Sequence, residues 1–188
     1  MLLLGLPSAA PAPAQDEADE VRAAEIKAAY LVNFVRYTVW PASSFEAPDT
    51  PIRVVVVGDD AVADELHAIL ERSPLIAGRP LEIESFRLPA RRLREGDQAV
   101  EELRRAHALF LGESDEEQVG VLLETARKYD VLTVGDPPRF AALGGMIGLR
   151  EEGRRIAFDA NPAAIRGSRL QVSARVLQLA RVVAPGGS

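Results

Sequence analysis

The hydrophobic pattern in the middle of the chain alternates between strand-like and helix-like segments. The first strand pattern is the β-branched run from Ile52 to Val57, which is typical of a strand covered on both faces by helices. Further strand patterns follow at residues 81–86, 107–111 and 131–134, and helix patterns fill the intervals at residues 60–71, 96–106 and 115–128. This alternation predicts an α/β fold: a three-layer α/β/α sandwich around a mostly parallel sheet.

A helix is predicted before the first strand. Apolar residues recur at helical spacing from Asp16 to Trp40, and Pro41 is expected to end the helix. The predicted helix carries an aromatic stripe of four residues: Tyr30, Phe34, Tyr37 and Trp40. Such a stripe is typical of a helix face buried in the core, and it would equally suit contact with a second copy of the chain.

The C-terminal third departs from the alternation. Strand patterns at residues 146–150 and 155–159 flank a turn sequence, which predicts a β-hairpin. Asn161-Pro162 predicts the capped start of a short helix that ends at Gly167. The apolar spacing from Leu170 to Val183 predicts a terminal amphipathic helix.

Length and composition indicate one globular domain over residues 16–184. The chain has 188 residues, 47% of them hydrophobic and 27% charged, which is ordinary for a folded domain. Residues 1–15 combine a short apolar run with a stretch rich in Pro, Ala and Ser, as expected of a signal-peptide remnant or a disordered tail. Because Ala12-Pro13-Ala14 supplies the small residues that a signal peptidase recognises, we expect cleavage before Gln15 and export to the periplasm.

Charge and residue usage exclude several classes of function. The 28 acidic and 22 basic residues give a net charge of -6, so the chain lacks the basic surface of a nucleic-acid-binding protein. The absence of cysteine excludes disulfides, thiol nucleophiles and thiolate metal sites. Only His67 and His107 could supply imidazole ligands, so we predict no metal and no cofactor.

Motifs of common enzymes are also missing. The sequence contains no G-x-G-x-x-G, no phosphate-binding P-loop and no G-x-S-x-G element, and the third predicted strand ends in Leu111-Gly112 without the carboxylate that a receiver domain phosphorylates. A non-enzymatic regulator is therefore favoured. Two alternatives use the carboxyl ends of the strands near Gly58-Asp59, Gly112 and Gly135-Asp136, namely a small-molecule binding pocket or an enzyme built on those aspartates.

Several strings, taken together, point to a known family. They occur in one order along the chain: Ala28 to Phe34 with Trp40-Pro41, Val131 to Asp136, Gly144 to Ile147, and Ile156 to Asn161. From about Glu25 to Val183 the chain resembles the YfiR family of periplasmic regulators, and the stretch from Leu170 to Ala180 resembles the last helix of that family.

The resemblance implies a function. It implies a secreted, non-enzymatic repressor that binds the periplasmic domain of an inner-membrane GGDEF diguanylate cyclase and so lowers cyclic di-GMP and biofilm formation. It further implies a homodimer and, as a second partner, an outer-membrane lipoprotein. Some relatives carry disulfides that tie repression to redox state, and this control cannot be carried over to a chain without cysteine.

The resemblance also implies a regulatory surface. The family's F-[DE]-x-N segment corresponds here to Phe158, Asp159 and Asn161. Ile165, Gln171 and Ser173, on the helices predicted to follow, would complete the surface. Three of these residues have a plainer structural interpretation, because Phe158 and Ile165 suit a core and Asn161 suits a helix cap.

Overall fold

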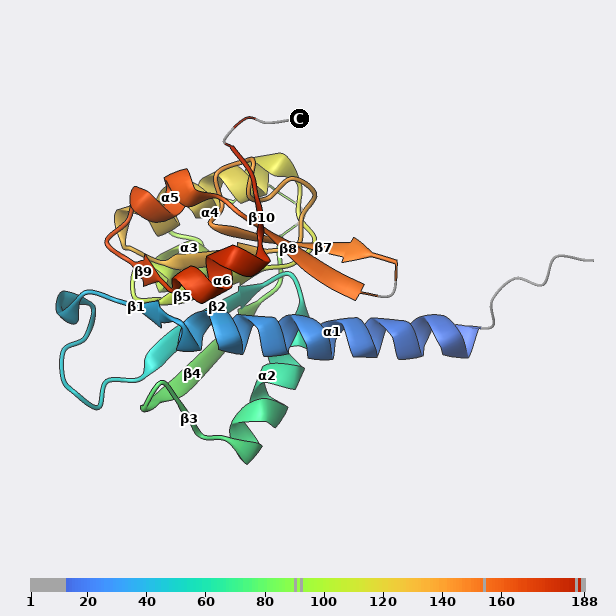
Figure 1. Ribbon diagram of the computed structural model, residues 1–188, viewed down its shortest axis with the longest axis horizontal. Helices are drawn as coiled ribbons and strands as arrows, with labels where there is room; N and C mark the ends of the chain where they lie inside the picture. Colours follow the sequence, from blue (N-terminus) through green and yellow to red (C-terminus); the bar gives the residue numbers. More distant parts are fainter. Residues whose placement is uncertain (1–12, 90, 92, 154, 185, 187–188) are drawn as a thin grey trace, which may run out of the picture.

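The computed structural model describes residues 13–184 except 90, 92 and 154, together with residue 186. Within these residues the chain forms a three-layer sandwich, with helices on both faces of a curled, mostly parallel sheet, so the predicted fold class is confirmed (Figure 1). The predicted signal segment falls largely at residues 1–12, which lie outside the described residues, and the expectation of export stays a prediction.

The main sheet has the strand order β10-β8-β7-β6-β5-β2-β4-β3. Its strands are β2 (Ile52–Val57), β3 (Leu75–Ile76), β4 (Arg79–Phe86), β5 (Ala108–Leu111), β6 (Leu132–Gly135), β7 (Ile147–Glu152), β8 (Arg155–Ala160) and β10 (Arg181–Val182). Neighbours are parallel from β4 through β2, β5 and β6 to β7, and also between β8 and β10, whereas β7 pairs with β8 as the predicted antiparallel hairpin. A separate antiparallel pair joins β1 (Thr38–Val39) to β9 (Gln171–Val172).

Alternate side chains of β2 enter the two halves of the core. Val54 and Val56 pack into the cluster that includes residues of α1 (Pro13–Arg36) and α2 (Asp60–Arg72). Val55 and Val57 pack into the opposite cluster, which includes residues of α3 (Gln98–Leu103) and α4 (Glu116–Lys128). Since both faces of β2 are covered, its β-branched pattern was a reliable signal for a buried strand. The shorter helices are η1 (Ala42–Ser44), α5 (Pro162–Arg166) and α6 (Ala174–Leu179).

The first helix ends earlier than predicted. It stops at Arg36, and the predicted extension to Trp40 is wrong. Thr38 and Val39 pair instead with β9, and the Thr38 hydroxyl donates to the carbonyl of Phe34 at 2.7 Å, which caps the last turn. Tyr30 and Phe34 therefore share a helix, whereas Tyr37 and Trp40 follow it and point into different surroundings: Trp40 is buried, and Tyr37 is 43% exposed.

The terminal helix is much shorter than predicted. Six residues, 174–179, are helical, and the stretches at 171–172 and 181–182 are strands. The apolar spacing from Leu170 to Val183 also suits these short elements, and pairing of β9 with the distant β1 and of β10 with the nearby β8 decides between them.

Two local features also differ from the prediction. Strands β3 and β4 form a hairpin through Ala77-Gly78, both with positive φ (52° and 80°), as a type I′ turn requires. Because Ala rarely occupies such a turn, β3 could not be predicted from the local pattern. The cap of α2 lies one residue before the helix pattern predicted to begin at residue 60: the Asp59 carboxylate accepts from the Val62 amide at 3.0 Å.

His107, at the start of β5, is a buried structural residue. Its Nδ1 accepts from the Arg53 amide at 3.0 Å, and its Nε2 lies 2.9 Å from the Ser44 carbonyl oxygen, to which it can donate. The ring stacks on Phe45 with centroids 4.6 Å apart. Burial lowers the pKa of His107 below its ordinary value of 6.5, and the nearby guanidinium groups of Arg53 and Arg79 lower it further.

This environment predicts a histidine-specific loss of stability in acid. A depressed pKa means that His107 contributes stability above about pH 6.5 and that this contribution is lost as the pH falls through the folded-state pKa. We expect His107→Phe to cost about 1–2 kcal/mol of unfolding free energy at pH 7.5, because two buried hydrogen bonds lose their partner, and to cost less at pH 5. Denaturant titrations at both pH values measure this, with His67→Gln on the exposed part of α2 as the control. An equal cost at both pH values would contradict the assignment.

Candidate functional site

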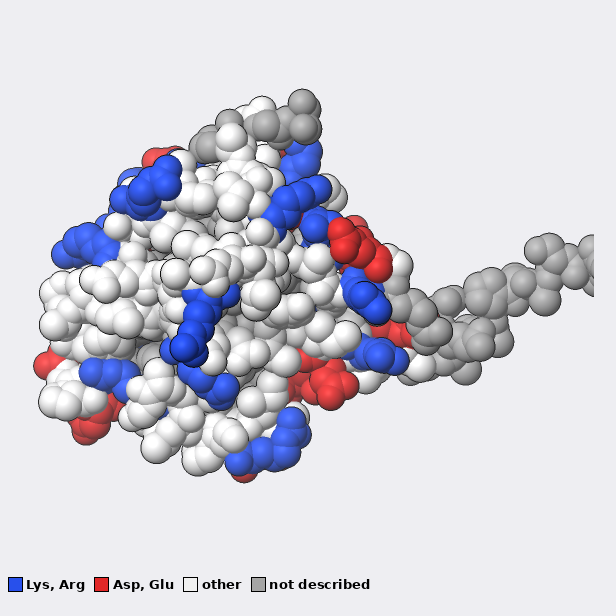
Figure 2. Space-filling view, viewed as in Figure 1, with Lys and Arg blue, Asp and Glu red and all other residues white. Residues whose placement is uncertain are grey.

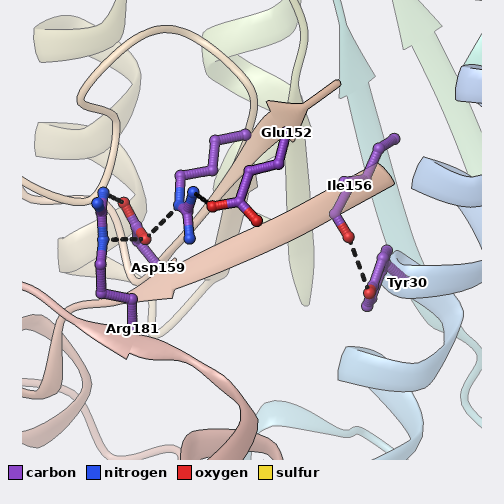
Figure 3. Close-up of polar contacts among 6 residues, drawn as sticks. Tyr30, Glu152, Ile156, Asp159 and Arg181 are labelled. Carbon is purple, nitrogen blue, oxygen red and sulfur yellow. Dashed lines mark hydrogen bonds and ion pairs between the residues drawn. The ribbon is translucent and has the colours of Figure 1, made fainter. Parts of the chain in front are cut away.

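Phe158, the first residue of the predicted regulatory segment, lies against the aromatic residues of the first helix. Its ring is 5% exposed and meets the rings of Phe34 and Tyr30 edge-on, with centroids 5.0 and 5.5 Å away. The Tyr30 hydroxyl donates to the carbonyl of Ile156 on the same strand, at 3.1 Å (Figure 3). The predicted aromatic stripe and the predicted regulatory segment therefore meet in one aromatic cluster, through which α1 packs on β8.

Asp159 lies on the other side of β8 from Phe158 and ties three strands together. Its carboxylate accepts from Arg150 on β7 at 2.8 Å and from two nitrogens of Arg181 on β10 at 2.9 and 2.6 Å (Figure 3). Arg150 also pairs with Glu152. Burial alone would raise the pKa of Asp159, but the hydrogen bonds from Arg181 and Arg150 outweigh it and lower the pKa. Asp159 is thus an ionised anchor for the edge strand β10.

Asn161 and Ile165 support the same region from within. Asn161 is 1% exposed; its Oδ1 accepts from the amides of Ala163 and Ala164 at the start of α5, and its Nδ2 donates to the Ala141 carbonyl at 2.8 Å. Ile165 is buried in the core on the α1 side of the sheet. Asn161 and Ile165, like Phe158, are buried, so they affect the surface only by positioning the elements that they contact.

Gln171 and Ser173 are the members of the predicted set nearest the surface. Gln171 is exposed and pairs with Val39 across the β1–β9 ladder. The Ser173 hydroxyl accepts from the Arg175 amide and caps α6, and the Ser173 amide donates to the Tyr37 carbonyl at 2.9 Å. These contacts place Tyr37 and Val39 beside the predicted regulatory residues.

Exposed apolar side chains lie on β1, next to these residues, and on the elements that follow them in the chain. Among the described residues seven large apolar side chains are exposed, and four of them come from β1, α6, β10 and the residue before β1. We call these four the apolar face: Tyr37, Val39, Leu179 and Val182, which are 43%, 61%, 79% and 64% exposed. Figure 2 shows uncharged surface in the region of α6, with basic side chains lying across it and near β10. Apolar surface interspersed with arginine is a composition that protein-binding surfaces share.

A second group of residues gathers at the carboxyl ends of the parallel strands. Asp59 follows β2 and Asp136 follows β6, and Lys27 of α1 reaches both, forming an ion pair with Asp136 and lying 3.8 Å from Asp59. Gly112 lies between them, where a Cβ atom would come within 2.5 Å of the Gly58 carbonyl oxygen. The strand ends therefore meet as the sequence analysis expected. Lys27 was missed because nothing near it in the sequence marks a partner 109 residues away.

The pKa values of Asp136 and Lys27 are both raised from their ordinary values. Burial raises the pKa of Asp136 by more than Lys27 lowers it, and the neighbouring Asp59 carboxylate adds to the rise. Burial also lowers the pKa of Lys27, but its hydrogen bond to Asp136 and the two carboxylate charges reverse that effect and raise it. The Oδ1 atom of Asp136 is buried without a hydrogen-bond partner. Within the described part of the chain, no three His, Asp or Glu side chains converge as metal ligands would.

Comparison with known proteins bears on this architecture. A family model described as YfiR/HmsC-like matches residues 24–181. The chain belongs to the YfiR/HmsC-like family. The matched range begins at Ala24, a buried residue within α1, and ends in β10, so it reaches every strand of the main sheet. No curated protein matches the chain.

Membership of the YfiR/HmsC-like family confirms the resemblance and gives the general function. The family consists of periplasmic, non-catalytic regulators of diguanylate cyclase signalling. None of the helices in the described residues has both the length and the apolar character to cross a bilayer. The roles of individual residues in the predicted regulatory surface are not fixed by the family match and stay predictions.

Proposed function

We propose that this protein represses an inner-membrane GGDEF diguanylate cyclase by binding the cyclase's periplasmic domain through the apolar face. The observation that carries the proposal is the position of that face. Val39 pairs with Gln171 and the Tyr37 carbonyl accepts from the Ser173 amide, and the family resemblance assigned Gln171 and Ser173 to regulation. Leu179 lies on α6, which Ser173 caps, and Val182 lies on β10, which Asp159 anchors.

Repression from outside the membrane requires binding that distinguishes two states of the cyclase. A ligand shifts a conformational equilibrium only by the difference between its affinities for the two states, and nearly complete switching needs about 5.5 kcal/mol. An interface of ordinary size, roughly 800 Å² on each partner, can supply such a difference. Leu179 and Val182, the most exposed members of the apolar face, would add apolar area to such an interface, and a charge at either position would have to be desolvated on binding.

The remaining family expectations complete the proposal. We infer that the exported protein is a homodimer and that an outer-membrane lipoprotein competes for it when repression is relieved. Among the four residues of the aromatic stripe, Tyr37 is the most exposed, so a contact between two copies through the stripe would involve Tyr37.

The proposal predicts the behaviour of a double variant, Leu179→Asp with Val182→Asp. Deleting the gene should raise cyclic di-GMP and biofilm, and the parent protein supplied in trans should reverse the rise. The double variant should fail to reverse it and should bind the purified periplasmic domain of the cyclase at least about 30-fold more weakly, since charges replace two apolar anchors. Mass spectrometry of cyclic di-GMP and calorimetry of binding measure the two effects.

The control is Leu75→Asp. Leu75 is 56% exposed, comparable to the substituted residues, but lies on β3 at the opposite edge of the sheet. This variant should bind and repress as the parent does, and all three variant sites are exposed enough that folding should be little affected. Unchanged cyclic di-GMP in the deletion strain, with the protein expressed and exported in the parent, would count against the regulator. Full repression by the double variant would exclude the apolar face as the contact.

A further inference from the structure

A cavity of about 700 Å³ is lined by Asp159, which anchors β10, and by Lys27 and Asp136 at the carboxyl ends of the parallel strands. Its walls come from four separate parts of the chain: Lys27 on α1, the segment from Asp136 to Ala142 after β6, the β7–β8 hairpin, and the chain from Arg181 to Ala184. The volume lies in the range that holds small organic ligands. The family match assigns nothing to this cavity.

The lining is basic compared with the rest of the protein. It contains four basic side chains and three acidic ones, whereas the whole chain has 22 basic and 28 acidic residues. The basic members are Lys27, Arg139, Arg150 and Arg181. A concave site that concentrates positive charge on an acidic protein attracts anions toward it and away from the remaining surface.

Three of the four cations already have partners. Lys27 pairs with Asp136, and both Arg150 and Arg181 pair with Asp159, one wall of the cavity (Figure 3). The Arg139 side chain makes no hydrogen bond and no ion pair with any described residue, although its backbone carbonyl accepts from the Leu143 amide. Its backbone is left-handed, with φ 62°, a conformation that costs free energy for a residue with a side chain. Arg139 is exposed and lines the cavity, so its guanidinium is available to an anion there.

The rest of the lining is apolar and suits the hydrocarbon part of an organic ligand. Pro138, Ala141, Leu149 and Ile156 contribute apolar surface between the charged walls. A guanidinium presents paired N–H donors in a plane, which match the two oxygens of a carboxylate. Asp159 shows this geometry within the same site, where its carboxylate takes two nitrogens of Arg181.

We propose that the cavity binds a small organic carboxylate, with Arg139 as the partner of the carboxylate group and the apolar lining as the contact for the ligand's body. The proposal that a carboxylate binds here depends only on the cavity and its lining. Its regulatory meaning rests on the proposed function, because Arg181 lines the cavity and precedes Val182 of the apolar face. A carboxylate bound beside Arg181 competes with Asp159 for that guanidinium and so acts on the strand that carries Val182.

Calorimetry on the purified full chain tests the binding, with benzoate as the probe. We expect saturable binding of benzoate, and no binding of benzyl alcohol, which has a similar body without the charge. Arg139→Gly should weaken benzoate binding by at least about tenfold, because a charged hydrogen-bonding partner is lost. Glycine also relieves the left-handed backbone, so this variant should fold at least as well as the parent. The matched control is Arg72→Gln, at the exposed end of α2 and outside the cavity, which should bind benzoate as the parent does.

The outcomes separate this site from the proposed function. Absence of saturable benzoate binding, or equal binding by the parent and Arg139→Gly, would overturn the site. Arg139-dependent binding of inorganic phosphate as tight as that of benzoate would overturn the assignment to organic carboxylates. Since no cyclase is present in these measurements, they can succeed or fail independently of repression. Adding benzoate to the cyclase-binding assay then tests the regulatory step, and an affinity for the cyclase that benzoate leaves unchanged would refute that step alone.

Discussion

Phe158→Ala is expected to lower the free energy of unfolding by about 4 kcal/mol, the largest effect of any single substitution considered for this protein. The phenyl ring is 5% exposed and touches the rings of Tyr30 and Phe34, so its removal leaves a void between α1 and β8 that neighbouring side chains can fill only in part. Denaturant titration measures the loss. Repression should also fall, because β8 carries the Asp159 anchor of β10.

Tyr37→Ala is the matched control. Tyr37 belongs to the same predicted stripe but is 43% exposed, so truncation should cost less than about 1 kcal/mol. If Phe158→Ala proved as stable as Tyr37→Ala while losing repression, Phe158 would be a contact residue and not a support. The two substitutions thus distinguish the structural interpretation of Phe158 from the regulatory one.

Lys27→Met should cost about 3 kcal/mol at pH 8, because it leaves the Asp136 carboxylate largely buried without its cation and beside a second carboxylate, Asp59. The loss should shrink as the pH falls toward 5. Burial already raises the pKa of Asp136, and removing Lys27 raises it further, so in the variant the carboxyl group takes up a proton on acidification and the cost of the unpaired charge disappears. Unfolding titrations at several pH values measure both effects.

Lys128→Met provides the comparison, since Lys27 and Lys128 are the only lysines in the chain. Lys128 pairs with Glu124 on the surface of α4, with both side chains more than 60% exposed, and such pairs contribute little. We expect a cost below about 0.5 kcal/mol with no dependence on pH between 5 and 8. A loss in Lys27→Met that is equally small, or that grows in acid, would show that the cluster at the strand ends is not electrostatically coupled.

The elements that could be predicted from sequence are those whose surroundings are the same along the whole element or whose contacts are with neighbouring residues. The β-branched run of β2 is covered on both faces, and the cap of α5 by Asn161 uses only neighbouring residues, so both were predicted from sequence. The end of α1 and the strands β9 and β10 depend on partners more than a hundred residues away or on pairs of residues too short to show a period. Helical spacing in Leu170–Val183 was therefore misleading.

The residues of the candidate sites also divide into those that could be placed from sequence and those that could not. Asp59 and Asp136 could be placed together from sequence, because strands of a parallel sheet end at one edge. The role of Asp159 as an anchor could not, since Arg150 and Arg181 are two of many arginines and only the pairing of β7, β8 and β10 selects them. Arg139 gave no signal at all, because its distinguishing properties are a left-handed backbone and the lack of a partner.

The packing of α1 has a consequence for the order in which the chain folds. The helix is made first and packs chiefly on α2, yet two of its side chains bond to late parts of the sequence: Lys27 to a residue 109 positions away, and Tyr30 to one 126 positions away. Native structures dominated by such distant contacts form slowly, because long loops must close before the contacts are gained. Until β8 has been synthesised, Tyr30 and Phe34 lack the Phe158 ring against which they pack. The complete packing of α1 is therefore reached only when nearly all of the chain is available, and the same residues that stabilise the finished domain delay its completion.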